Sequence, residues 1–165
     1  MDKQKIFKAC GVAVVLFIIL AALGTSTPRT VNQFVRNYNS EIKDAMTRHV
    51  DKQAVDRFAK RCSLNASGKG FNGVNATFDG YNEPKPAFMF KFAESASPAE
   101  VFGMIDAAIE AVGDDYRKVD EALGILKGTE YNINGGYQKD ITINGKEYLI
   151  GWIGETINFM IIISK

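Results

Sequence analysis

The C-terminal segment of the chain limits the possible folds more than any other part. Residues 157–163 read Ile-Asn-Phe-Met-Ile-Ile-Ile, and near its end this run is apolar on both faces of a strand. A strand of this kind at the edge of a sheet would expose apolar side chains beside unpaired backbone groups, which promotes aggregation. We therefore predict that the segment lies inside a sheet, or that a helix covers its outer face.

Two further regions have the alternating pattern of strands joined by turns. The first pair of strands is joined by residues 80–86, which are rich in turn formers. The second pair is joined by Asn144-Gly145, the strongest two-residue hairpin pattern. The alternating apolar positions are Val74, Ala76, Phe78, Phe88, Phe90 and Phe92 in the first pair, and Ile141, Ile143, Tyr148, Ile150 and Trp152 in the second.

Two helices are predicted before the first hairpin. Thr30 and Gln33 form a capping box, and apolar residues at helical spacing follow it for about 18 residues. A weaker helical pattern covers residues 54–62. His49 is expected at the surface near the end of the first helix, where the helix dipole favours a positive charge.

Two more helices are predicted between the hairpins. Ser97-Pro98-Ala99-Glu100 combines a capping box with proline at the first helical position, and Gly113 is placed to end this helix. Its apolar face is wide, so we expect it to lie flat on a sheet. The other helix is expected over residues 114–127, with Gly128 ending it.

This order of elements predicts a single α+β domain over residues 30–165. We expect an antiparallel sheet of about five strands packed on one face by two or three helices. Residues 25–29 are expected to be a short linker. A chain of 165 residues is long enough for one domain and too short for a large multi-domain enzyme.

The N-terminus has the parts of an export signal. Lys3, Lys5 and Lys8 precede a run of sixteen uncharged residues at 9–24, which ends in small residues. We predict a signal peptide over residues 1–24, cleaved before Thr25, which places the domain in the periplasm or outside the cell. The alternative is an uncleaved membrane anchor over residues 6–24, with the domain again outside the cytoplasmic membrane.

Composition excludes several classes of function. The net charge is +1, and removing three lysines and one aspartate with residues 1–24 leaves 17 basic and 18 acidic residues. This balance gives no reason to expect nucleic acid as a partner. The processed chain would keep one cysteine, Cys62, and one histidine, His49, so we expect no metal site and no cofactor.

Few residues are candidates for catalysis. Cys62 and His49 could form a thiol nucleophile pair, but Cys62 lies at an apolar helical position and is expected to be a buried hydrophobe. The densest acidic group is Asp114, Asp115, Asp120 and Glu121, which we interpret as a helix start followed by a solvated face. We therefore assign no catalytic residues.

Two loops are the predicted contact surface for a partner. One is the Gly- and Ser-rich segment 63–73, where Lys69 and Phe71 are candidate contacts, and the other is the turn with Asn82 and Lys85. Asn65 and Asn75 stand in N-glycosylation acceptor patterns, and the sequence leaves their modification open.

These observations predict a small, exported, non-enzymatic protein-binding module of the inhibitor or immunity type, whose partner is another envelope or secreted protein. One alternative is a membrane-anchored structural or exclusion factor. A second is a small thiol hydrolase that uses Cys62 and His49. An apolar ligand held beside Phe88, Phe90, Phe92 and Trp152 is a further possibility.

Overall fold

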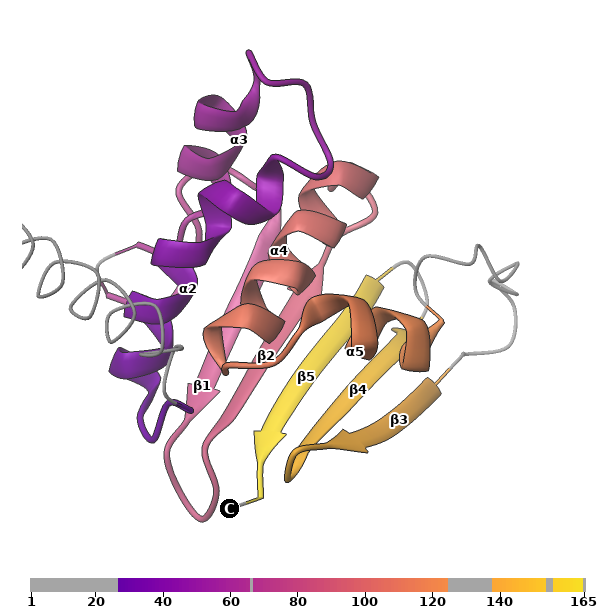
Figure 1. Cartoon of the computed structure of the whole chain (residues 1–165). Helices are drawn as coiled ribbons and strands as arrows, with labels where there is room; N and C mark the ends of the chain where they lie inside the picture. The colour runs from indigo at the N-terminus through magenta and orange to yellow at the C-terminus, as the bar shows by residue number, and fades with distance from the viewer. Residues whose placement is uncertain (1–26, 66, 125–137, 154–155, 165) are drawn as a thin grey trace, which may run out of the picture.

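Figure 1 shows the computed structural model, which describes residues 27–65, 67–124, 138–153 and 156–164. Five strands form one antiparallel sheet, and helices pack on it, so the predicted α+β fold is confirmed. The strands are β1 (Ala76–Tyr81), β2 (Ala87–Phe92), β3 (Gln138–Ile143), β4 (Lys146–Ile153) and β5 (Thr156–Ile163). Their order across the sheet is β1-β2-β5-β4-β3.

The apolar C-terminal strand occupies the centre of the sheet. β5 pairs with β2 on one side and with β4 on the other, and both pairings are antiparallel. Its backbone groups are therefore bonded on both sides, and the predicted interior position is confirmed. Phe159 and Ile161 are fully buried on the helix side.

Both predicted hairpins are present. β1 pairs with β2, although β1 begins at Ala76, two residues later than the alternation suggested. β3 pairs with β4 through a turn in which Asn144 has φ 51° and Gly145 has φ 73°. Asparagine and glycine tolerate these left-handed conformations better than other residues, which explains why this dipeptide joins the strands.

The described residues contain two helices before the first hairpin and two after it. Their bounds are α2 (Val31–Met46), α3 (Val55–Cys62), α4 (Pro98–Ala111) and α5 (Tyr116–Leu123). In Figure 1, α2, α4 and α5 lie on the same face of the sheet. α3 packs beside α2, where the Tyr38 hydroxyl donates to the Cys62 carbonyl at 2.8 Å and Lys43 pairs with Asp56 at 2.8 Å. Met46 of α2 lies so close to Gly103 of α4 that a Cβ at Gly103 would be 2.6 Å from the Met46 methyl.

Both predicted helix starts are present, but the full capping box forms only at α4, because at α2 the Gln33 side chain accepts from the Arg29 amide at 3.1 Å. The Thr30 hydroxyl accepts a hydrogen bond from the Gln33 amide at 3.2 Å. At α4, the Ser97 hydroxyl accepts from the Glu100 amide, and the Glu100 carboxylate accepts from the Ser97 amide at 2.9 Å. Each cap satisfies backbone donors that the first helical turn leaves free.

Replacing Ser97 with alanine is expected to lower the free energy of unfolding by about 1 kcal/mol, because the first turn of α4 loses its cap. Chemical denaturation of the variant measures this change. The matched control is Ser95→Ala, two residues earlier, where the hydroxyl accepts from the exposed Asn75 side chain instead of capping a helix. Equal losses in the two variants would contradict the capping role.

The helix predicted over residues 114–127 is shorter than expected. α5 ends at Leu123 because Gly124 adopts a left-handed conformation with φ 73° and its amide bonds to the Asp120 carbonyl. The sequence analysis predicted that Gly128 ends this helix, and Gly128 lies outside the described residues. The stop at Gly124 was therefore not predicted. Asp115 caps the start of α5, as expected of an acidic residue there.

An aromatic cluster forms the centre of the core between α2 and the sheet. Phe34 stacks on Phe88 with ring centroids 4.0 Å apart, and Phe90 packs against Phe78 at 5.2 Å. Phe88, Phe90 and Phe92 are all fully buried, so the predicted core face of this hairpin is confirmed. These rings therefore belong to the packed core, where aromatic contacts contribute beyond the area they bury.

The predicted targeting segment, residues 1–24, lies outside the described residues. Within the described ranges, every helix is too short or too polar to span a bilayer.

Candidate functional site

The face of the sheet opposite the helices, here called the outer face, has no helix on it among the described residues. Strand register places its outward side chains in rows that run across the five strands. The row at the middle, here called the methionine row, contains Asp79, Met89, Met160, Leu149 and Asp140 in that order. Its three central residues are apolar and half-buried, and its two end residues are exposed aspartates.

The neighbouring row, here called the glycine row, contains Thr77, Lys91, Asn158, Gly151 and Gln138. Between these two rows the outer face has a hollow of about 460 Å³, with Met89, Met160 and Leu149 on its apolar side. Gly151 also lines the hollow. Because glycine has no side chain, this position leaves space that a larger residue would occupy.

On the other side of the methionine row the outward residues are Tyr81, Ala87, Ile162, Glu147 and Thr142. Tyr81 is 54% exposed, and Ile162 is half-buried. The outer face thus has an apolar centre on β2, β5 and β4, and charged or polar residues at its edges. Apolar surface with a polar rim is typical of protein–protein contact sites, and methionine adapts well to partners of different shape.

Both predicted contact loops touch the first half of α2. Gly68 of the first loop packs near Val35, and the Asn82 side chain accepts a hydrogen bond from the Val31 amide at 2.8 Å. Lys69 and Lys85 are exposed. Phe71 instead packs its ring against Tyr38 and Phe90, with centroid distances of 6.3 and 6.0 Å.

A shallow polar depression lies between α2 and the first loop. Asn32, Arg36, Asn39, Asn65 and Gly68 line it. Asn39 is already bonded to the loop, since its amide nitrogen donates to the Leu64 carbonyl at 2.9 Å and its oxygen accepts from the Leu64 amide at 2.9 Å. Part of this polar surface therefore holds the loop in place.

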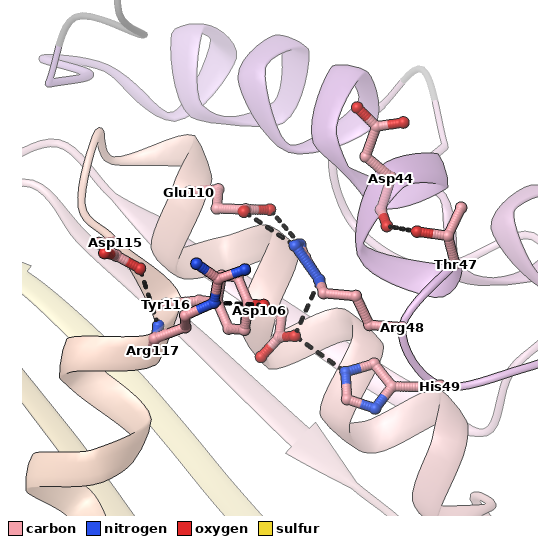
Figure 2. A network of polar contacts seen from close by, with 9 residues as sticks. All are labelled: Asp44, Thr47, Arg48, His49, Asp106, Glu110, Asp115, Tyr116 and Arg117. Carbon is pink, nitrogen blue, oxygen red and sulfur yellow. Dashed lines mark hydrogen bonds and ion pairs between the residues drawn. The ribbon is translucent and has the colours of Figure 1, made fainter.

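A polar network joins the end of α2 to α4 and α5 (Figure 2). Arg48 donates two hydrogen bonds to Glu110, at 3.0 and 2.5 Å, and its guanidinium lies 4.0 Å from the centroid of the Tyr116 ring. His49 Nε2 lies 2.8 Å from Asp106 Oδ2, with the His49 side chain only 15% exposed. The expectation of a surface histidine was therefore wrong, because α4 supplies a carboxylate partner that helix position alone does not reveal.

Asp120 of α5 belongs to the same network and is only 2% exposed. Burial, the charge of Asp106 and a hydrogen bond with the Asp106 carboxyl group together raise the pKa of Asp120 to about 8, against the opposing effect of Arg48. The Asp120 carboxyl group therefore keeps its proton at neutral pH. Burial also raises the pKa of Glu110, against the opposing effect of Arg48.

The predicted solvated face was thus wrong for Asp120, and the predicted helix start did not include the burial of Asp114. Asp120 is buried in the network, and Asp114 is 8% exposed and forms an ion pair with Lys146 at 3.1 Å. Asp115 and Glu121 are exposed, as expected. Asp106 and Asp120 are too deeply buried to contact a substrate, so the network connects helices and does not form an open acid–base site.

The structure gives the proposed thiol pair no supporting geometry. Cys62 is fully buried, which confirms the expected buried hydrophobe, and burial raises the pKa of its thiol to about 12. A nucleophilic cysteine needs the opposite shift, toward thiolate at neutral pH. His49 is bonded to Asp106, and the part of the chain that the structure describes contains no group of three or more residues suited to a metal ion.

Alkylation of the native protein at Cys62 is expected to be slow and to proceed only as fast as the core opens, because the thiol is buried and protonated. Mass spectrometry of the peptide that contains Cys62, with and without denaturant, measures this rate. Rapid modification under native conditions would contradict the buried position and revive the thiol hypothesis.

Comparison of the chain with protein-family models, with curated proteins and with solved structures finds no match. Sequence reasoning did not assign Met89, Leu149, Met160 or Gly151 to a site. The two-faced apolar pattern of residues 157–163 was the available indication, because a central strand with a second apolar face must present that face to something.

Proposed function

We propose that the protein is a small, exported, non-enzymatic module that binds a partner protein through the outer face of its sheet. The observation that supports this most is the apolar centre of the methionine row, which no described helix covers. Domains of two layers bury the apolar face of a sheet against helices, and the helices that the structure describes do so on one side of this sheet. The second apolar face is therefore available for a partner.

The site chemistry agrees with binding better than with catalysis. The side chains that line the hollow belong to methionine, leucine, isoleucine, lysine, threonine and amide residues. The residues that line it include no histidine, cysteine or carboxylate, so the Thr156 hydroxyl has no general base beside it in the lining. A hollow with apolar and polar sides can seat one large side chain of a partner and orient it, as at the centre of protein interfaces.

The decisive variant is Gly151→Val, which fills the hollow without disturbing the core. Gly151 lies in β4 and is absent from the glycines with positive φ, so its backbone accepts a side chain. Valine has a higher propensity for strands than glycine, so we expect the free energy of unfolding to rise by about 0.5–1 kcal/mol. Binding should nevertheless be lost, because the space for the partner's side chain is occupied.

The test immobilises the purified protein, exposes it to envelope extract and compares captured proteins between variants. A partner that the unmodified protein retains and Gly151→Val loses supports the proposal. Gly70→Val is the matched control, since a Cβ at Gly70 would meet only the Asn65 side chain, at 3.6 Å. Capture that depends on Gly70 and not on Gly151 would assign binding to the loop at 63–73 and overturn the proposal.

The proposed export has a separate test. Mass spectrometry of the protein purified from its native host is expected to show an N-terminus at Thr25. An intact N-terminus in the membrane fraction would favour the anchored alternative, and an intact N-terminus in the cytosol would overturn export.

A further inference from the structure

The charges at the two ends of the methionine row define the chemistry of the partner. Resting on the proposed function, we infer that the outer face binds a partner segment that is apolar at its centre and has a lysine or arginine near each end. Asp79 on β1 and Asp140 on β3 would pair with these basic groups. Met89, Met160 and Leu149 would contact the apolar centre.

The register gives the spacing that such a segment must have. Asp79 and Asp140 are at the two edges of a five-stranded sheet, so four steps between neighbouring strands separate them. At about 4.8 Å a step, their Cα atoms are roughly 19 Å apart. A helix of about 13 residues has this length, which makes a short peptide a sufficient probe.

Both aspartates are available for pairing. They are exposed, and neither forms an ion pair with any residue that the structure describes. A partner's basic group would therefore break no existing ion pair. Glu147 adds a third carboxylate to the outer face, and Lys91 is the opposing charge, so the outward residues of the described strands have an excess of two negative charges.

The same charges disfavour other occupants. A second copy of the chain stacked on this face would bring two negatively charged faces together, which opposes association. An anionic membrane surface or a nucleic acid would be repelled for the same reason. A basic, apolar-centred protein segment is the occupant that both the apolar row and its charged ends favour.

The test titrates isotopically labelled protein with two synthetic peptides and follows backbone amide shifts by NMR. The peptides share a leucine-rich centre of helical spacing and differ only in their ends, which are lysines in one and glutamates in the other. We expect the lysine peptide to shift amides of β2, β5 and β4 and to bind about tenfold more tightly, as two or more exposed ion pairs would give. This preference should weaken as salt is raised.

The double variant Asp79→Asn/Asp140→Asn provides the specific control. This variant should bind the two peptides with equal affinity. Its free energy of unfolding should stay unchanged, because both side chains are exposed at the sheet edges. Equal binding of both peptides at the outer face would overturn the inference about charge and leave the proposed function standing. Failure of the lysine peptide to shift this face would also overturn it, and the Gly151→Val capture experiment then decides the proposed function separately.

Discussion

Replacing Asp114 with asparagine is expected to lower the free energy of unfolding by about 3–5 kcal/mol, because it leaves a buried charge without its partner. Asp114 Oδ1 lies 3.1 Å from Lys146 Nζ, and both side chains are at most 5% exposed. The same carboxylate accepts hydrogen bonds from Asn144, at 2.8 Å, and from the Tyr148 hydroxyl. The variant would therefore weaken the connection between the start of α5 and the hairpin of β3 and β4.

Urea denaturation of the variant and of two controls measures this effect. Asp115→Asn changes the neighbouring exposed aspartate to an equally good helix cap and should be nearly neutral. Asp114→Asn combined with Lys146→Met removes both charges and should recover most of the loss. If the double variant is as unstable as Asp114→Asn alone, the unpaired lysine is not the cause.

The unmodified protein is expected to lose stability as the pH rises from about 4 to about 8, through Asp120. Its pKa is raised from 3.8 to about 8 in the folded protein, so in this range the folded state holds a proton that the unfolded state has released. Stability then falls with increasing pH, by up to about 1.4 kcal/mol per pH unit. The contribution is complete below the unfolded pKa and ends above the folded pKa.

Asp120→Asn should remove this slope. Its amide can donate to Asp106 as the protonated carboxyl group does, and the unfolded state no longer gains from ionisation. We expect the variant to be more stable by on the order of 3 kcal/mol at pH 7, with little difference at pH 4. The neighbouring exposed Glu121→Gln is the control and should leave the pH profile as it is. A profile that Asp120→Asn does not flatten would refute the raised pKa of Asp120.

The sequence was sufficient for those parts of the fold that local chemistry determines. The Ser97 cap, the Asn144-Gly145 turn and the alternation of Phe88, Phe90 and Phe92 each depend on residues close in the chain. The central position of β5 also followed, because at an edge its apolar side chains would lie beside unpaired backbone groups. The antiparallel α+β fold is the sum of these local determinants.

The polar interior could not be predicted in the same way. Asp114, Asp120 and His49 occupy positions that are usually solvated, and their partners lie 32 to 57 residues away or on another helix. Nothing in the spacing along one helix indicates that α4 would bring Asp106 against two other elements. The stop at Gly124 was missed because a second glycine follows at 128, and the pattern does not distinguish between them.

The candidate site was only partly visible in the sequence. The prediction emphasised the loop with Lys69 and Phe71, because exposed loops commonly bind partners. The structure uses the Phe71 ring in packing, whereas the outer face combines residues from all five strands. Such a surface depends on strand order and register, which the alternation of Met89 or Met160 alone could not supply.

The most direct test of the outer face is site-specific photo-crosslinking in living cells. A photoreactive residue at Gln138, at the rim of the hollow, is expected to form a crosslink to a partner protein, and the crosslink should disappear when Gly151→Val is added. The photoreactive residue in place of Lys118, which is exposed on α5, should give no crosslink. A crosslink from Lys118 or from Lys69, with none from Gln138, would contradict the assignment of binding to the outer face.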